Sequence, residues 1–196
     1  MAQILYVIAM EKEATDIAKK MNMKLENNIY TNGKQDLIIS GIGKQRTAIA
    51  LTKYLLTHEK PQKIINIGYA GSTDLKIGSW ATIEKSYNYE WYIPGEEQYS
   101  MSDYGNQKLL TIPNVTKVNC YSAESFATTT NLKGHIAFDM ELHSIALICD
   151  KENIPLISLK KISDNLSLEK YYETTNTNLM ELVSGLELLK NIENEE

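Results

Sequence analysis

One stretch decides the fold of this chain: residues 137–164, which read AFDMELHSIALICDKENIPLISLKKISD. Apolar residues recur at i, i+3, i+4 and i+7 over 142–149, which predicts the buried face of a helix. Pro155 and the residues just before it end that helix. The apolar run over 156–162 then reads as a buried strand. The stretch therefore predicts a helix followed directly by an interior strand.

Two acidic residues frame these elements. Glu141 opens the predicted helix, and Asp164 lies at the carboxyl end of the predicted strand. Ligands of open α/β sheets collect at the carboxyl ends of the strands, so the two carboxylates form a candidate site. Acidic residues also favour helix caps and first turns. A helix cap and a polar loop residue therefore remain the alternative interpretation.

The same pattern occurs closer to the start of the chain. Residues 4–9 form a continuous apolar run, typical of a buried strand, and a helix through about Met21 follows. Glu13 thus lies in the first turn of a helix, just beyond a strand. Residues 63–67 read as another buried strand, which runs into the small residues of 68–72. Small residues at a strand end let a ligand approach the backbone closely.

The remaining segments complete the alternation of strands and helices. Asn32-Gly33 has the chemistry of a tight hairpin turn. The glycine-rich turn over 40–44 precedes a helix, and it indicates either an anion site or a tight connection. We further expect hairpin strands over 28–31 and 36–39, a helix over 45–57, strands over 80–92 and 117–121, a polar loop over 93–106, a helix over 168–190 and a frayed tail over 191–196.

Aromatic side chains crowd the far end of the strand expected over 80–92, at Tyr87, Tyr89, Trp91 and Tyr92. Three interpretations of this cluster stay open. It could line a pocket, pack at a subunit interface, or form ordinary strand surface, because aromatic residues favour strands.

The composition suits one globular domain with a real core, because the chain has 196 residues of which 43% are hydrophobic. Strands that alternate with helices, together with one antiparallel hairpin, predict an α/β fold. We expect residues 1–196 to form a single three-layer α/β/α domain around a central mixed β-sheet.

Charge and cysteine content exclude several classes of function. The net charge of -5 argues against a nucleic-acid partner, since phosphate backbones require a basic face. Arg46 is the only arginine, and Cys120, Cys149 and the histidines show no metal-ligand spacing. We expect no zinc site. The sequence shows no signal peptide and no apolar stretch that could span a bilayer, so we expect a cytoplasmic protein without a membrane partner.

A series of short motifs, read in order, resembles one enzyme superfamily. They are Ala9-Met10-Glu11-Lys12-Glu13, Ser40-Gly41-Ile42-Gly43-Lys44, Asn66-Ile67-Gly68-Tyr69-Ala70-Gly71, Ser122-Ala123-Glu124-Ser125-Phe126, Asp139-Met140-Glu141 and Ile162-Ser163-Asp164. In this order and spacing they resemble the nucleoside phosphorylase and nucleosidase superfamily. The nearest branch is the bacterial 5′-methylthioadenosine/S-adenosylhomocysteine nucleosidases.

The resemblance implies hydrolysis of the N-glycosidic bond of a small-molecule adenine nucleoside. Asp164 would act as the general acid that protonates N7 of adenine, and Ser163 would orient it. Glu13 would activate the water that attacks C1′ of the ribose, and neither a metal nor an organic cofactor would be needed. The resemblance also implies a homodimer, because the pockets of this family are completed across a subunit interface.

Further residues are implied to bind the substrate. Glu141 would accept hydrogen bonds from the ribose hydroxyls, and Met140 would pack against the sugar. Phe126 would stack on the base, whose edge would be read by backbone groups of Phe126 and Ala127. The other substrate-binding positions implied by the motifs are Ala9, Met10, Ile42, Tyr69, Ala70, Gly71 and Lys160.

The sequence departs from the family pattern at several positions. Lys160 stands in place of an arginine, and Tyr69 replaces a small residue beside the expected sugar site. Ser72 replaces a glycine, residues 123–124 vary their motif, and the chain is shorter than typical members over residues 90–115.

Two alternative functions stay open. A phosphorylase of the same superfamily would hold phosphate with arginines, but none lies near Asn66, and Arg46 is more typical of a surface or interface residue. A member that binds a nucleoside or a partner without turnover is suggested by Tyr69 and the shortened region. The presence of both Glu13 and Asp164 argues against it, because a pure binder needs neither.

Overall fold

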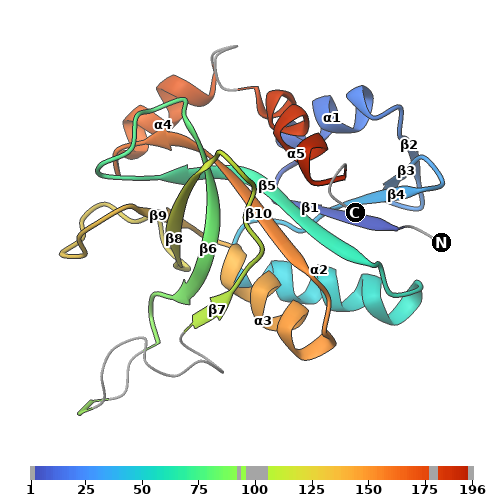
Figure 1. Ribbon diagram of the computed structural model, residues 1–196, viewed down its shortest axis with the longest axis horizontal. Coiled ribbons are helices and arrows are strands. Elements are labelled where there is room, and N and C mark those ends of the chain that lie inside the picture. Colours follow the sequence, from blue (N-terminus) through green and yellow to red (C-terminus); the bar gives the residue numbers. More distant parts are fainter. Residues whose placement is uncertain (1–2, 92–93, 96–105, 177–180, 194–196) are drawn as a thin grey trace.

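The computed structural model describes residues 3–91, 94–95, 106–176 and 181–193 (Figure 1). Its strands are β1 Ile4–Ile8, β2 Lys24–Glu26, β3 Ile29–Thr31, β4 Gln35–Ile39, β5 Lys63–Gly71, β6 Trp80–Asn88, β7 Asn106–Lys108, β8 Thr116–Ser122, β9 Ile136–Asp139 and β10 Leu156–Asp164. Its helices are α1 Glu11–Lys20, α2 Lys44–Thr57, α3 Leu142–Glu152, α4 Leu168–Thr175 and α5 Gly185–Glu193, with a 3₁₀ turn, η2, over Leu182–Ser184.

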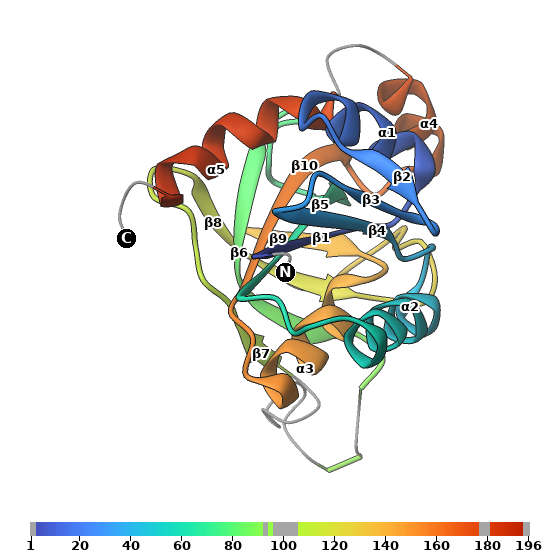
Figure 2. The same ribbon diagram turned by 90° about the vertical axis from the view of Figure 1, so that its right-hand side faces the viewer.

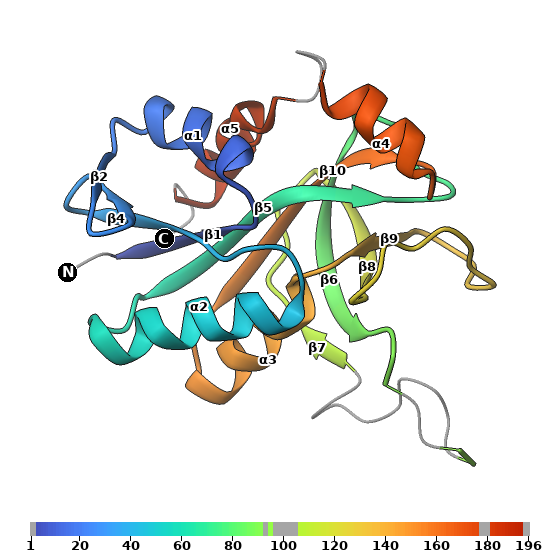
Figure 3. The same cartoon turned by 180° about the vertical axis from the view of Figure 1, so that it is seen from behind.

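The strands form one mixed sheet between two layers of helices. Helices α1, α4 and α5 cover one face, and α2 and α3 pack on the other, as Figures 1 and 3 show from opposite sides. The central strands β1, β5 and β10 are parallel and carry the core side chains on both faces. The α/β class and the mixed sheet predicted from the sequence are confirmed.

Part of the sheet closes into a ring. β10 pairs with β5 on one side and with β6 on the other, β6 pairs with β8, β8 with β9, and β9 returns to β5. Figure 2 shows these strands curving around a common axis, while β1, β4, β3 and β2 extend the sheet outward from β5. This closure was not predicted. It brings the carboxyl ends of β5, β9 and β10 together at one end of the ring.

The single helix predicted over 168–190 is wrong. The described residues form α4, then η2 and α5, with residues 177–180 outside the description. Side chains at the end of α4 bond back to carbonyl groups one turn earlier: Thr174 Oγ1 to Lys170 O at 2.8 Å, Thr175 Oγ1 to Tyr171 O at 2.7 Å and Asn176 Nδ2 to Tyr172 O at 2.8 Å. Such bonds compete with the backbone ladder and weaken a helix slightly, and three consecutive residues form them where α4 ends.

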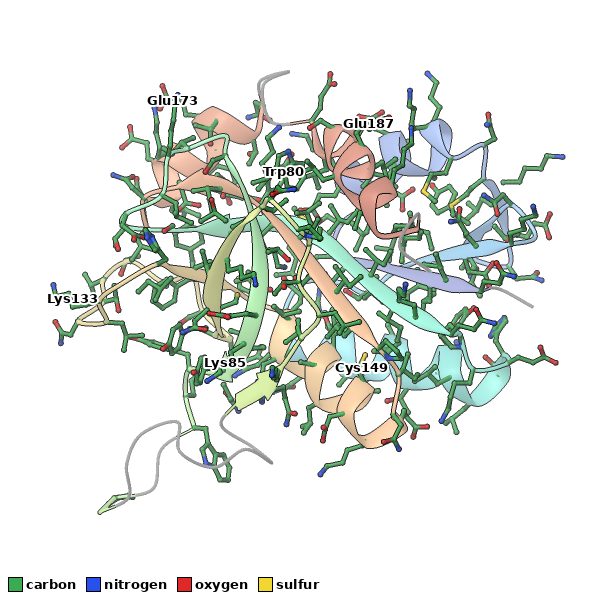
Figure 4. All side chains as sticks on the ribbon, viewed as in Figure 1. Trp80, Lys85, Lys133, Cys149, Glu173 and Glu187 are labelled. Carbon is green, nitrogen blue, oxygen red and sulfur yellow. The ribbon has the colours of Figure 1, made fainter. Side chains whose placement is uncertain are left out.

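Helix α5 begins at a glycine that faces the sheet. A Cβ atom at Gly185 would lie 2.7 Å from the ring of Trp80 at the start of β6. Trp80 lies beneath α5 and α4 in Figure 4, where the side chains of the whole molecule are drawn. The glycine therefore allows α5 to approach the sheet closely.

Other element boundaries also differ from the predictions. β5 continues past residue 67 to Gly71, because its small residues still pair with β10. β6 ends at Asn88, not at residue 92, because the chain enters a turn at residues 89–90. β2, β7 and β9 were not predicted. Most of the loop predicted over 93–106 lies outside the described residues; the exceptions are residues 94–95 and residue 106, which begins β7. The frayed tail was predicted over 191–196. Residues 191–193 belong to α5 instead, and residues 194–196 lie outside the described residues.

The aromatic cluster at the end of β6 packs against aromatic side chains of β8 and β9. Tyr87 stacks on Tyr121 with centroids 4.7 Å apart, and Tyr89 meets Phe138 edge-to-face at 5.5 Å. These contacts belong to a small core cluster beside the ring and favour the interpretation of packed strand surface for Tyr87 and Tyr89. Tyr92 lies outside the described residues.

Both cysteines are buried and free, and Cys149 lies on α3 (Figure 4). In the part of the chain that the structure describes, no helix has both the length and the apolar character needed to cross a bilayer.

Candidate active site

A pocket lies where the ring strands end. It encloses about 240 Å³ and is lined from β5, β9 and β10, from the starts of α1 and α3, and from α4. Its lining includes every residue predicted for the site: Ala9, Met10, Glu13, Ile42, Tyr69, Ala70, Gly71, Phe126, Ala127, Met140, Glu141, Lys160, Ser163 and Asp164. The structure thus brings these residues together, and their individual roles stay predictions.

Glu13 enters the pocket from the first turn of α1. Its Oε2 accepts the backbone N–H of Met10 at 3.0 Å, which fixes the carboxylate at the start of the helix. The residue is buried. Burial raises the pKa of Glu13 to about 7, against the opposing attraction of Lys160 and the hydrogen bonds from the N–H groups of Met10 and Tyr69. The side chain can therefore exchange a proton near neutral pH.

Glu141 lies at the start of α3 and is held by the glycine-rich turn. Its Oε1 accepts the N–H of Gly43 at 2.9 Å. Burial, followed by repulsion from Asp139, raises the pKa of Glu141 to about 7. Gly43 has a φ of 98°, a conformation that glycine adopts without strain. The turn is thus shaped to present its N–H to this carboxylate.

A second carboxylate reaches the same turn. Glu124 Oε1 accepts the N–H of Gln45 at 3.3 Å, and Oε2 lies 3.0 Å from the position of a Cβ on Gly43. The sequence left open whether the turn is an anion site or a tight connection. The structure combines the two interpretations. The turn connects a strand tightly to α2, and the anions that its N–H groups bind are carboxylates of the protein itself.

Asp164 ends β10 and is buried with its partner Ser163. Ser163 Oγ donates to Asp164 Oδ2 at 2.7 Å, and the N–H of Leu166 donates to Oδ1 at 2.8 Å. Burial raises the pKa of Asp164, against hydrogen bonds from Ser163 and two backbone N–H groups. A Cβ on Gly71 would lie 2.7 Å from Asp164 Oδ1, so only glycine leaves room for the carboxylate in this position.

Asp139 was not predicted as a site residue. Its carboxylate explains how the charged side chain of Lys160 can be buried in the pocket. Lys160 Nζ lies 2.7 Å from Asp139 Oδ2, and each side chain is 1% exposed. Asp139 also accepts Ser122 Oγ at 2.5 Å and the N–H of Leu142 at 3.0 Å. Burial alone would lower the pKa of Lys160, but the surrounding acids, Asp139 first, raise it. The lysine is therefore a buried cation.

A glycine separates this cation from Glu13. A Cβ atom on Gly68 would lie 3.6 Å from Lys160 Nζ and 3.8 Å from Glu13 Oε1. The absence of a side chain leaves the space between the ammonium and the carboxylate clear. Lys160 therefore stabilises the charged form of Glu13 across the backbone of β5.

One wall of the pocket is aromatic. Tyr171 of α4 meets Tyr69 at a centroid distance of 6.3 Å and Phe126 at 6.0 Å, both edge-to-face. Tyr69 therefore packs in the wall with Tyr171. Tyr171 was not predicted as a site residue. Which side chains of α4 face the pocket depends on how the turn after Asp164 orients that helix. The lining residues that were not predicted are Asn66, Ile67, Gly68, Phe138, Asp139, Leu166, Leu168, Tyr171 and Tyr172.

Across the described residues, no group of three or more histidine, cysteine or acidic side chains is placed to hold a metal ion. The chemistry available in the pocket is that of buried carboxylates, a buried ammonium and an aromatic wall.

Comparison with known proteins gives the family. No family model matches the chain. The 5′-methylthioadenosine/S-adenosylhomocysteine nucleosidase of Buchnera aphidicola from Acyrthosiphon pisum (strain Tuc7) is 33% identical over 178 residues, which cover 76% of this chain and 75% of that protein. The chain belongs to the 5′-methylthioadenosine/S-adenosylhomocysteine nucleosidase family. The nucleosidase of the same name from Oceanobacillus iheyensis is 25% identical and covers 91% of the chain and 95% of the relative.

Members of this nucleosidase family are N-glycosidases, so the enzyme class predicted from the sequence is confirmed at the level of the family. Solved structures support the fold. A Helicobacter pylori MTAN-D198N mutant with 5′-methylthioadenosine in its active site has a TM-score of 0.76 at 20% identity, with 100% of both chains covered. The native futalosine hydrolase of Helicobacter pylori has a TM-score of 0.77 at 18% identity, covering 100% of this chain and 98% of that chain.

Proposed function

We propose that this protein hydrolyses the N-glycosidic bond of a 5′-substituted adenosine, such as 5′-methylthioadenosine or S-adenosylhomocysteine, and releases adenine. The observation that carries the proposal is the meeting of Glu13, Glu141 and Asp164 in one pocket. Each belongs to a different strand-to-helix junction, and each has a raised pKa. Membership of the nucleosidase family supports the same reaction.

Asp164 acts on the leaving group. Adenine leaves poorly as an anion, so Asp164 donates a proton to N7 as the bond between N9 and C1′ breaks. Burial favours the protonated acid before transfer. The bonds from Ser163 Oγ and from the N–H of Leu166 then stabilise the carboxylate that remains. Phe126 and its neighbour Ala127 bind the base at the aromatic wall.

Glu13 and Glu141 act on the sugar. As the ribose becomes oxocarbenium-like, Glu13 takes a proton from the attacking water, whose oxygen bonds to C1′ on the face opposite adenine. Glu141 accepts hydrogen bonds from the ribose hydroxyls, and Met140 packs against the ring. The bond from Gly43 to Glu141 keeps that carboxylate oriented. One proton leaves the water for Glu13 and another passes from Asp164 to adenine, so the net change is hydrolysis.

The arrangement favours water over phosphate as the nucleophile. Glu13, Asp139, Glu141 and Asp164 give the pocket four acidic groups, whereas Lys160 is the only basic residue among the described residues that line it. The N–H groups at the start of α2 already bind carboxylates. An added phosphate dianion would meet repulsion here without an arginine to hold it.

The decisive experiment follows adenine and the sugar product after incubation with 5′-methylthioadenosine, with and without phosphate. Free 5-methylthioribose in phosphate-free buffer is the expected product. A phosphate requirement with formation of the sugar 1-phosphate would instead identify a phosphorylase. S-adenosylhomocysteine and futalosine belong in the same panel, because a fold neighbour is named for futalosine hydrolysis. Release of the base from none of them would contradict the proposal.

We also propose that the protein acts as a homodimer of single-domain subunits in the cytoplasm. Ile42 lines the pocket yet is 46% exposed, and Ile49 and Leu56 of α2 are 70% and 80% exposed. A second copy seated on α2 would cover these apolar side chains, which lie along the helix that begins beside the pocket. Light scattering should give twice the mass of the chain, and Leu56→Glu should halve it. A monomeric wild type would contradict the proposed dimer.

A further inference from the structure

Lys44 occupies an unusual position for a lysine. It is the first residue of α2, whose first turn carries no acidic residue. The start of a helix carries partial positive charge, so a cation there is unfavourable. Where a chain breaks a local rule in this way, the compensating contact is often functional.

The compensating contacts come from the end of β6. Lys44 Nζ donates to Asn88 Oδ1 at 2.7 Å and forms an ion pair with Glu90. The lysine side chain is 13% exposed, which partly shields the pair from solvent. The other oxygen of Glu90 accepts the N–H of Glu124 at 2.7 Å. Partial burial raises the pKa of Glu90, but the bonds from Lys44 and Glu124 outweigh it and leave the pKa lowered.

These contacts join two segments that line the pocket. Lys44 directly follows Gly43, whose N–H holds Glu141. Glu124 stands two residues before Phe126, which faces the pocket together with Ala127. The segment over 123–127 belongs to no strand or helix. The ion pair therefore links the turn that holds the ribose carboxylate to the segment that carries the base platform.

We propose that the Lys44–Glu90 ion pair positions the base-binding segment against the ribose-binding carboxylate. Lys44 and Glu90 are then both positioning residues for the substrate. This inference rests on the proposed function. Glu13 and Asp164 lie on α1 and β10 and do not contact the pair. Loss of the pair should therefore weaken substrate binding and leave the chemical step nearly intact.

The kinetic test compares Lys44→Met and Glu90→Gln with a matched control. Each variant should raise KM for the accepted nucleoside about tenfold, which is the scale of a lost hydrogen bond to a charged group. The same variants should change kcat by less than about twofold. Lys44→Arg, which keeps the charge, should restore most of the affinity. The control Lys60→Met breaks an exposed pair with Glu152 outside the pocket and should leave both constants unchanged. A fall in kcat at constant KM would overturn the inference.

Amide hydrogen exchange tests the same idea without relying on turnover. Lys44→Met and Glu90→Gln should speed exchange over residues 41–47 and 122–127, while exchange over α3 and β10 stays at the wild-type rate. Unchanged exchange in the two segments would refute the positioning role, whatever the kinetics. If the wild type releases no adenine, the proposed function fails, and exchange alone then decides whether the pair orders both segments.

Discussion

Replacement of Glu13 by glutamine should stabilise the protein above neutral pH while it removes activity. Glutamine keeps the shape of the side chain and an oxygen that can accept the N–H of Met10. It cannot take a proton from water, so turnover should fall by about a thousandfold, within the range of general-base catalysis. The gain in stability comes from removing a charge that the pocket holds at a thermodynamic cost.

The size of that gain follows from the pKa. Burial raises the pKa of Glu13 from 4.5 to about 7, and each pKa unit corresponds to about 1.4 kcal/mol, so ionisation costs the folded state about 3 kcal/mol. The folded protein binds this proton more tightly than the unfolded chain does. The wild type therefore loses this stability as the pH rises from about 4.5 through about 7. Glutamine carries no such penalty at any pH.

Urea unfolding at pH 4.5 and at pH 8 measures the effect. At pH 8 the Glu13→Gln variant should exceed the wild type by about 3 kcal/mol, or roughly 6–12 °C in Tm for a chain of this size. At pH 4.5 the two proteins should nearly coincide. Glu59→Gln removes the same charge from an exposed position and serves as the control, with no pH-dependent gain expected. An advantage of equal size at both pH values would refute the assignment of the cost to buried charge.

Three other measurements test the proposed roles. Asp164→Asn should lower kcat by at least about a hundredfold with little change in nucleoside affinity, because the amide keeps the fit but supplies no acidic proton; turnover at the wild-type rate would exclude Asp164 as the acid. kcat/KM should fall about tenfold per pH unit below about 7, because only ionised Glu13 can accept a proton; a flat profile from pH 5 to 8 would contradict this role. Lys160→Met should destabilise the fold by about 3–5 kcal/mol, because it leaves Asp139 buried without its cation. The double variant with Asp139→Asn should recover part of that loss, and a single-variant loss below about 1 kcal/mol would show that the pair is not needed.

The residues of the pocket could be predicted because their signals are local. Glu13 and Glu141 begin helices directly after buried strands, and Asp164 ends one, so the position of each relative to a strand end follows from neighbouring residues. Parallel strands then gather these ends at one edge of the sheet. The order of the short motifs identified the superfamily, whose fold the structure shares.

Features that depend on distant pairing could not be predicted. β9 covers only Ile136–Asp139, too short for a periodic pattern, and it joins β5 through the single pair Gly71 and Phe138. The ring closure that this pair completes has no local signal. The Asp139–Lys160 ion pair likewise joins two strands through space. Neither residue type reveals its partner in the sequence.

Side-chain chemistry at helix ends explains the remaining error. The apolar spacing over 168–190 is compatible with one helix, but Thr174, Thr175 and Asn176 offer hydroxyl and amide groups that bond back to the preceding turn. A periodicity count does not register that competition. The break at this point sets the extent of α4 and hence the wall formed by Tyr171.

The ring of strands also bears on how the enzyme is made. β10 is the last strand among the residues that the structure describes, and it closes the ring by pairing with both β5 and β6. During synthesis those two edges stay exposed until residues 156–164 leave the ribosome, and unpaired edges invite aggregation. The same strand carries Asp164 into the pocket. A chain that stops short of β10 would thus lack both the proposed acid and the closure of the ring, so we expect activity only from chains synthesised through residue 164.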